Sequence, residues 1–369
     1  MAASVSRVAV VGLGNAGHTL HLPALAGISS ASVVGAVDVD AGRRARAAAA
    51  WKAPVFEDFD AMLAQARPEV VVIGTPPQTH AEYCLRALEA GANVICEKPF
   101  VSSLEEADRV IDAAATAGRR VALNHEFREM PIFRAVRDHA KGVVFAQAWQ
   151  LMDLPPWAEA NWRSQMLTRT LYEAGVHLVD YIMALFGEKP HAVSATMSTC
   201  GVRDEESDAV ALVTLEFSRG RLAQIVQNRL CKGETQYFEV RADTPAASYR
   251  ASFGGRARLS AGMLRSTRPH VRLEYGVSGL AWKEVGHERT VIEKNPKDPA
   301  MLATRILFEK TLSAFRDGGV PPASAEDGRD VLEVIAACYH AAATGRRVAL
   351  ADIELRELAG LAMGELPVA

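Results

Sequence analysis

Hydrophobic residues in the first third of the chain form short continuous runs separated by longer stretches with helix-forming residues. The runs are at residues 8–11, 32–37, 70–74, 94–96 and 121–123. Continuous apolar runs of this length are typical of strands buried on both faces, and helices between them indicate a parallel sheet covered on both sides. We therefore predict an α/β domain over residues 1–124.

Helix-start signals lie between these runs. Asp58 is expected to be an N-cap, Pro76 and Pro77 to begin a helix that runs toward Gly91, and Ser103 to open a capping box with Glu106. A capping box pairs a serine hydroxyl and a glutamate carboxylate with the free N–H groups of the first helical turn, and proline is favoured at the first helical position. These signals predict helices that alternate with the strands.

The pattern changes after residue 124, where we place the start of a second domain, 125–369. We expect a strand over 143–151 and short β-prone runs broken by Gly, Asp and Arg over much of 192–300, which favours an antiparallel sheet. Helices are expected over 130–141, 171–186, 302–317 and 325–345. The stretch 250–272 is rich in Arg, Ser and Gly, and we interpret it as a solvated hairpin or loop, with binding of an anionic group or a neighbouring subunit as the alternative.

Composition agrees with a two-domain soluble protein. A chain of 369 residues exceeds one ordinary core, and 49% hydrophobic with 23% charged residues is typical of soluble proteins. The net charge of -3 gives no global basic bias toward nucleic acid. No apolar run approaches the roughly 20 residues that span a bilayer, so no membrane partner is expected.

Cysteine usage and the N-terminus bear on the compartment. The five cysteines have no paired spacing, which favours a reducing compartment and no structural metal site. The first strand begins within a few residues of Met1, which leaves no room for a signal peptide. We therefore predict a cytoplasmic protein that holds no metal.

A glycine-rich segment, Gly12-Leu13-Gly14-Asn15-Ala16-Gly17, follows the first hydrophobic run. Glycines at this spacing allow a tight turn, close approach of the backbone to a pyrophosphate, and packing of the next helix on the strand. Asp38 ends the second run about 20 residues later, where an acid accepts the ribose hydroxyls of NAD and disfavours the extra phosphate of NADP. Arg43 and Arg44 leave NADP open, although a solvated helix face is the favoured interpretation of both.

The run at 94–96 ends in Glu97-Lys98-Pro99. In a parallel sheet, Thr75, Glu97 and Asn124 emerge at the same edge as the glycine turn, which is where such folds bind ligands. A lysine that is partly desolvated beside a carboxylate has the proton chemistry of a catalytic residue. The alternative is a surface ion pair that closes the strand.

The helix predicted over 171–186 is apolar almost all round, yet it carries Glu173, His177 and Asp180 at spacings of four and three, which places them on one face. Burying such groups without partners costs roughly 1–3 kcal/mol for each polar atom, so this face must line a cavity or an interface. A buried histidine–carboxylate pair is the structural alternative. A metal site at Glu173 and His177 lacks an evident third ligand.

At these motifs the chain resembles the glucose–fructose oxidoreductase/inositol dehydrogenase (Gfo/Idh/MocA) family. The residues that carry the resemblance are Gly12, Gly14, Gly17, Thr75, Pro76, His80, Ala90, Gly91, Glu97, Lys98 and Pro99. The resemblance implies an N-terminal Rossmann dinucleotide-binding domain, a C-terminal α+β domain with a large, mostly antiparallel sheet, and a cis peptide bond between Lys98 and Pro99. It also implies assembly into a homodimer or homotetramer through the exposed second-domain sheet.

Glu173, Gly175, His177 and Asp180 match the spacing of the family's second signature, an acid, a glycine, a histidine and an aspartate on one helix. Two departures alter the expected pocket. Glu173 stands where the family has aspartate, and Thr168-Arg169-Thr170 replaces a glycine-rich run. Trp162 and Arg163 resemble a family feature near cofactor and substrate, and core packing and a surface charge are their alternatives.

The resemblance implies an NAD(P)-dependent dehydrogenase of sugars or polyols, with NAD as the cofactor and NADP as the alternative. We predict His177 as general base, Lys98 as the group that stabilises the alkoxide, and Glu173 as binding a neighbouring hydroxyl or orienting the imidazole. Asp180, Trp162 and Arg163 are substrate candidates. The predicted cofactor-binding residues are Gly12, Gly14, Asn15, Ala16, Asp38, Thr75, Pro76, His80, Glu97, Lys98 and Asn124.

Three other functions remain open from the sequence. Some enzymes of this family keep NAD bound and use transient oxidation to cleave or eliminate from a sugar. A non-catalytic sensor of dinucleotide and ligand would usually lack Lys98 or His177, and both are present. A methyltransferase with the same nucleotide fold is compatible with Asp38 but not favoured by Glu97-Lys98-Pro99.

Overall fold

The computed structural model describes residues 5–153, 163, 166, 168–200, 207–232, 236–254, 256–263, 269–276 and 278–352. The chain divides into two compact units. The first comprises Met1–Glu126 and Ala300–Glu333, and the second Phe127–Pro299 and Val334–Ala369.

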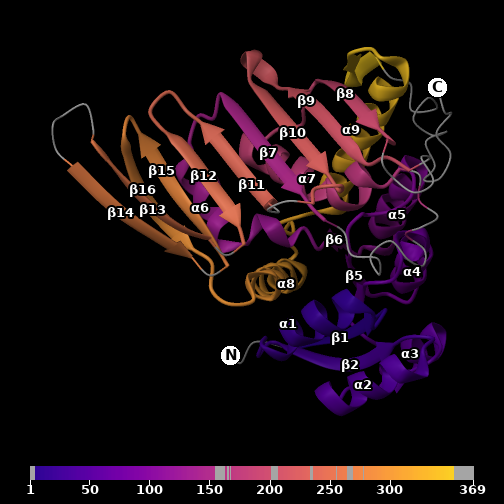
Figure 1. Ribbon diagram of the computed structural model, residues 1–369. Helices are drawn as coiled ribbons and strands as arrows, with labels where there is room; N and C mark the ends of the chain where they lie inside the picture. Colours follow the sequence, from indigo (N-terminus) through magenta and orange to yellow (C-terminus); the bar gives the residue numbers. More distant parts are fainter. Residues whose placement is uncertain are drawn as a thin grey trace. The chain divides into compact units, whose positions relative to one another are not determined.

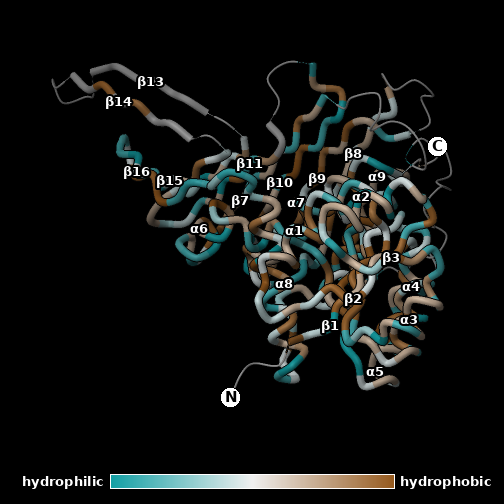
Figure 2. Tube along the Cα trace, turned by 90° about the horizontal axis from the view of Figure 1, so that it is seen from below, coloured by the Kyte–Doolittle hydropathy of each residue, from teal (hydrophilic) through white to brown (hydrophobic). Residues whose placement is uncertain are grey.

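The first unit is built on a sheet of six parallel strands in the order β3-β2-β1-β4-β5-β6. The strands are β1 (Ser6–Val11), β2 (Ala31–Val37), β3 (Val55–Phe56), β4 (Val70–Ile73), β5 (Asn93–Cys96) and β6 (Val121–Leu123). Strands β2 and β3 extend the sheet to one side of β1, and β4 to β6 extend it to the other side. The dinucleotide-binding α/β fold has the same strand order. Figure 2 shows hydrophobic residues in β1 and β2, and β1 and the last three residues of β2 are buried except for Arg7. The predicted parallel sheet is confirmed.

Helices connect the strands of the first unit as the sequence signals predict. They are η1 (Gly17–His21), α1 (Leu22–Ala26), α2 (Ala41–Trp51), α3 (Phe59–Ala66), η2 (Pro77–Thr79), α4 (His80–Glu89) and α5 (Leu104–Ala117). Asp58 caps α3 by accepting from the Ala61 N–H at 2.7 Å, and Ser103 caps α5 by accepting from the Glu106 N–H at 3.2 Å. The Glu106 carboxylate accepts from the Ser102 N–H. The predicted capping box therefore forms, but the glutamate binds the residue before the N-cap.

Residues 300–333 belong to the first unit, whereas the sequence pattern placed them with the second domain. Helix α8 (Pro299–Asp317) contributes Phe308 and Leu312 to the hydrophobic cluster that contains Val8 and Val10 of β1. The Leu123 N–H of β6 donates to the Ala323 carbonyl at 2.9 Å. Apolar contacts and a hydrogen bond to the edge strand therefore make residues 300–333 part of the first hydrophobic core. Local periodicity does not predict contacts between segments so far apart in the sequence.

A nine-stranded sheet forms the second unit, in the order β16-β15-β12-β11-β7-β10-β9-β8-β17 (Figure 1). The strands are β7 (Phe145–Leu151), β8 (Ala192–Ser198), β9 (Val210–Glu216), β10 (Leu222–Asn228), β11 (Gln236–Asp243), β12 (Ser248–Phe253), β15 (Gly279–Val285), β16 (Glu288–Lys294) and β17 (Val348–Ala349). Among the described pairs of this sheet, β7 and β10 run parallel and the others antiparallel. The expected large, mostly antiparallel sheet is confirmed.

Helices α6 (Pro131–His139) and α7 (Val176–Phe186) cover the same face of this sheet. Phe133 of α6 and Tyr181 of α7 both contact Phe238 of β11, with ring centroids 4.3 and 5.8 Å apart. The Tyr181 hydroxyl donates to the Phe133 carbonyl at 2.7 Å, which gives its buried polar end a partner. Helix α7 follows η6 (Thr170–Ala174), and α9 (Ala325–Thr344) continues from the first unit into the second.

The arginine-rich stretch predicted as a hairpin or loop contains a hairpin. Strands β13 (Arg256–Met263) and β14 (Pro269–Gly276) pair antiparallel in a separate two-stranded sheet.

All five cysteines are free. Within the described part of the chain, no helix is both long enough and apolar enough to cross a bilayer.

Candidate active site

Steric requirements at the glycine turn fit a dinucleotide. Gly12 has φ +87°, and a Cβ there would lie 2.6 Å from the Gly74 carbonyl carbon, so only glycine suits this position. A Cβ on Gly17 would collide with the Gly12 carbonyl oxygen, whereas a Cβ on Gly14 would have no atom of the described residues within 4 Å apart from its own chain neighbours. The first and third glycines thus pack the turn, and the second leaves the space that a pyrophosphate requires.

Asp38 lies at the carboxyl end of β2 and is tied to the glycine turn. Its Oδ2 accepts from the Leu13 N–H at 2.8 Å, and its Oδ1 accepts from the Asp40 N–H at 2.9 Å. Arg43 Nη1 lies 3.4 Å from Asp38 Oδ2 and its side chain is 46% exposed, so this guanidinium could still turn toward a phosphate. Arg44 donates to the Asp38 and Val39 carbonyls and to the Glu57 carboxylate. These hydrogen bonds hold its guanidinium in place beside β2.

The carboxyl ends of β5 and β6 meet at a buried polar cluster. Glu97 Oε1 lies 2.7 Å from His21 Nε2 and accepts from Asn124 Nδ2, also at 2.7 Å. Burial raises the pKa of the Glu97 carboxyl, but the hydrogen bond and charge of His21, with Lys98 and Asn124, outweigh burial and lower the pKa to about 2. An ionised carboxylate therefore lies directly before Lys98.

His80 links the turn after β4 to the turn after β5. Its Nε2 lies 2.8 Å from the Thr75 carbonyl oxygen, and its Nδ1 lies 2.9 Å from the Phe100 carbonyl oxygen and 3.0 Å from that of Pro99. Burial lowers the pKa of His80, and these carbonyl groups oppose that shift. The Lys98–Pro99 peptide bond is cis, as expected from the family resemblance.

In the second unit, the helix that carries the second signature is held from both sides. His177 is 3% exposed, and its ring stacks on Phe127 at 4.3 Å between centroids with 22° between planes. Asp180 is 1% exposed and forms a two-oxygen ion pair with Arg128, whose Nε lies 3.0 and 2.9 Å from the two carboxylate oxygens. Stacking and ion pairing together fix the rotation of α7.

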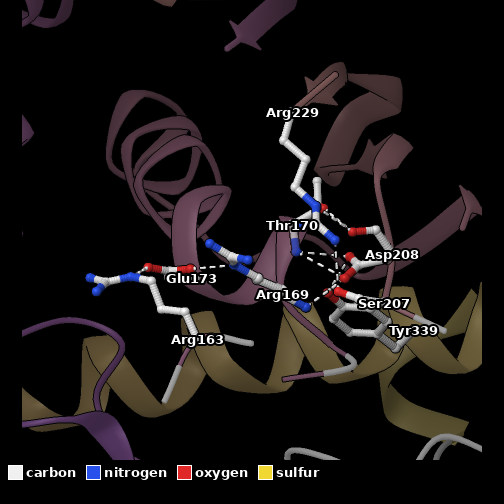
Figure 3. A network of polar contacts seen from close by, with 8 residues as sticks. All are labelled: Arg163, Arg169, Thr170, Glu173, Ser207, Asp208, Arg229 and Tyr339. Carbon is white, nitrogen blue, oxygen red and sulfur yellow. Dashed lines mark hydrogen bonds and ion pairs between the residues drawn. The ribbon is translucent and has the colours of Figure 1, made fainter. Parts of the chain in front are cut away.

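Glu173 accepts from two arginines. Arg163 Nε contacts one carboxylate oxygen, and Arg169 Nε lies 2.9 Å from the other (Figure 3). The Arg169 side chain is 4% exposed and that of Glu173 17%. The glutamate that replaces the family's aspartate is thus clamped by guanidinium groups, one of which comes from the segment that replaces the family's glycines.

Asp208 fixes the start of the same helix (Figure 3). Its carboxylate accepts from the backbone N–H groups of Arg169 at 2.5 Å and Thr170 at 2.9 Å, and from the Tyr339 hydroxyl at 2.8 Å. Arg229 donates to the Asp208 carbonyl at 2.8 Å. Burial, together with the Asp208 carboxylate, raises the pKa of Tyr339, so this hydroxyl stays a donor. Asp208 therefore acts as a distant N-cap for η6.

The structure thus gathers the predicted residues in two sets. The first unit brings Gly12, Asp38, Thr75, Glu97 and Asn124 to one sheet edge. The second unit carries Glu173, His177 and Asp180 on consecutive turns of η6 and α7. Trp162 lies outside the described residues.

Sequence reasoning missed four residues that hold these sets in place: His21, Arg128, Arg169 and Asp208. Arg128 and Asp208 lie 52 and 38 residues from the groups they bind, so no local spacing signals them. His21 lies one helical turn after Gly17. Its position in the helix that follows the glycine turn was the sequence feature that could have marked it as a site residue. In the described ranges, no three His, Cys, Asp or Glu side chains are grouped as metal ligands would be.

Comparison with known proteins agrees with this geometry. Residues 6–125 match the model of an oxidoreductase family with an NAD-binding Rossmann fold, and residues 144–350 match the C-terminal α/β domain of the same family. Inositol 2-dehydrogenase 4 of Saccharopolyspora erythraea is 28% identical over 96% of this chain and 98% of that protein. D-apiose dehydrogenase of Paraburkholderia graminis is 26% identical over 90% of this chain and 87% of that protein.

A solved oxidoreductase from Agrobacterium radiobacter, in complex with NAD+, L-tartaric acid and magnesium, shares the fold with a TM-score of 0.77 at 16% identity, over 94% of this chain and 99% of that one. At this identity the structural similarity supports a shared fold only. The two family matches together cover most of the chain. The chain therefore belongs to the Gfo/Idh/MocA oxidoreductase family and carries its NAD-binding Rossmann domain and its C-terminal α/β domain.

Proposed function

We propose that this protein is a dehydrogenase that oxidises a secondary alcohol of a sugar or polyol, or reduces the corresponding ketone, with NAD or NADP. The observation that carries the proposal is the position of Lys98. It directly follows Glu97, whose carboxylate is held by His21 and Asn124 at the sheet edge that also bears the glycine turn. The relatives named inositol 2-dehydrogenase and D-apiose dehydrogenase support the substrate class.

Lys98, His177 and Glu173 would have separate roles in the reaction. Lys98 would donate a hydrogen bond to the reacting hydroxyl and stabilise the alkoxide as it forms. His177 would remove the hydroxyl proton, and its stacking on Phe127 fixes the plane of the imidazole. Glu173, held by Arg163 and Arg169, would position a neighbouring hydroxyl. When bound, the nicotinamide supplies the hydride chemistry.

We propose NAD as the preferred cofactor. The carboxylate of Asp38 lies at the carboxyl end of β2, 2.8 Å from the Leu13 N–H of the glycine turn. In this fold such an acid accepts the ribose hydroxyls of NAD, and its charge disfavours a 2′-phosphate. The position of Arg43 makes NADP the alternative to be measured.

Absorbance at 340 nm with NAD and NADP separately, against inositols, aldoses, D-apiose and nucleotide sugars, tests the proposal. We expect formation of reduced cofactor with at least one member of the panel and faster turnover with NAD. A protein that retains NAD tightly and releases no NADH with any of them would favour transient oxidation instead.

We also propose assembly into a homo-oligomer. The face of the second-unit sheet opposite α7 carries exposed Leu212 and Leu222 on the neighbouring strands β9 and β10. Light scattering checks the assembly state, and a monomer would refute it.

A further inference from the structure

Two glutamines lie side by side in the interior of the second unit. Gln150 of β7 and Gln227 of β10 are register partners on adjacent parallel strands, and they are 1% and 0% exposed. In the described part of the chain, no protein group hydrogen-bonds to Gln150 Oε1 or to either polar atom of the Gln227 amide. A buried amide without partners costs about 1–3 kcal/mol for each polar group, so proteins seldom keep such a pair without a reason.

The same two strands provide an internal comparison. Gln147 and Gln224 are also register partners on β7 and β10, three residues earlier and therefore on the opposite face. There Gln147 Nε2 donates to Gln224 Oε1 at 3.0 Å. Two glutamines in this register can thus bond to each other, and the inner pair does not.

The inner pair lies under the helix that carries the second signature. Segments η6 and α7 pack against β7, β9 and β10, and they bear Glu173 and His177. A register shift in β11 places residues 237 and 238 opposite Gln150, an irregularity of the kind that often adjoins active sites. The Phe238 ring stacks on Phe127 at 5.1 Å, and Phe127 stacks on His177.

We propose that Gln150 and Gln227 form a hydroxyl-binding subsite for a sugar or polyol. Each amide offers an acceptor oxygen and a donor NH2, and each hydroxyl both donates and accepts. Adjacent strands are about 4.8 Å apart, so the two amides can each hydrogen-bond to a different hydroxyl of one polyhydroxylated molecule. A carboxylate would leave both amide oxygens unpaired, and a cation would leave both NH2 groups unpaired, so a polyhydroxylated ligand fits the pair best.

This subsite rests on the proposed function for its ligand class, and two experiments separate the two proposals. The first measures Gln150→Leu and Gln227→Leu, with Gln224→Leu on the outer face as the matched control. With the best substrate of the panel, we expect KM to rise about tenfold in each inner variant while NAD affinity stays unchanged. The unfolding temperature of the inner variants should equal or exceed that of the wild type, because apolar atoms replace unpaired amides.

Unchanged KM in both inner variants would overturn the subsite, as would a loss of thermal stability in both with no change in KM. The control should match the wild type in KM.

The second experiment needs no known substrate. A crystal structure of the wild-type protein grown with glycerol, a small polyol, should show two glycerol hydroxyls within hydrogen-bond distance of the two amides. Water alone between them, or a direct Gln150–Gln227 hydrogen bond, would overturn the subsite. If no sugar is turned over but glycerol binds here, the dehydrogenase proposal fails and the subsite stands.

Discussion

His21 Nε2 lies 2.7 Å from Glu97 Oε1, and both side chains are buried in the first unit. The imidazole comes from the π-helical turn η1, which follows the glycine turn, and the carboxylate comes from the end of β5, 76 residues later. This contact ties the first βα connection of the sheet to the strand that presents Lys98. It also makes the ionisation of Glu97 part of the stability of the site.

The lowered pKa of Glu97 predicts a pH dependence of stability. A carboxyl with a folded pKa of about 2 against an ordinary value of 4.5 stabilises the fold above pH 4.5, and this contribution is lost as the pH falls toward 2. At neutral pH the contribution is about 3 kcal/mol. Denaturant unfolding of the wild type and Glu97→Gln should show a gap that is constant from pH 7 to 5 and narrows below pH 4.5. A gap that does not change with pH would contradict this account.

Gly12 and Gly14 should respond differently to alanine. Gly12→Ala puts a Cβ against the Gly74 backbone at a positive φ, so we expect a loss of thermal stability as well as of NAD binding. A Cβ at position 14 meets no atom of the described residues within 4 Å beyond its chain neighbours, so Gly14→Ala should keep stability while NAD affinity falls. Thermal unfolding and NADH fluorescence titration measure the two effects. Equal stability losses in both variants would show that the glycine at position 14 serves only the fold.

Lys98→Met should lower turnover at least about a hundredfold and leave cofactor affinity largely intact. In the proposed mechanism the ammonium acts where charge develops on the substrate oxygen, whereas the glycine turn and Asp38 would bind the cofactor. Steady-state kinetics and NADH titration check the two halves of this expectation. Near-normal turnover would remove Lys98 from the mechanism.

His177→Ala should abolish one limb of the pH–rate profile. A general base with an imidazole loses activity as it becomes protonated, so the wild-type rate should fall toward acid pH and the variant should lack this limb. The profile of kcat/KM from pH 5 to 9 is the measurement. An acid limb that persists unchanged in the variant would assign it to another group.

Asp180→Asn should destabilise the second unit strongly. The substitution removes the negative charge that faces the buried Arg128 guanidinium, and breaking a buried ion pair typically costs about 3–5 kcal/mol. Glu57→Gln is the matched control, because its pair with Arg44 lies at the surface, with Glu57 74% exposed, and should cost less than about 1 kcal/mol. Urea unfolding of both variants compares them. Similar small losses would mean that Arg128 and Asp180 do not depend on each other.

The sequence alone determined the first sheet, its caps and the edge at which Asp38, Thr75, Glu97 and Asn124 lie. Short continuous apolar runs between helix signals indicated strands buried on both faces, and the positions of these residues at the strand ends follow from parallel geometry. The spacing of Glu173, His177 and Asp180 likewise predicted one helical segment, which the structure divides into η6, with Glu173, and α7, with His177 and Asp180. These features depend on local periodicity, which a single sequence reports directly.

Only the tertiary structure decided which groups meet across long sequence separations. It brought α8 back to the first core, placed Arg128 on Asp180 and Asp208 on Thr170, and set Gln150 beside Gln227 beneath α7. The physical reason is that sequence neighbours do not say which distant strand or side chain a buried polar group will face. Periodicity specifies the faces of helices and strands, and the contacts between distant faces are settled when the chain packs.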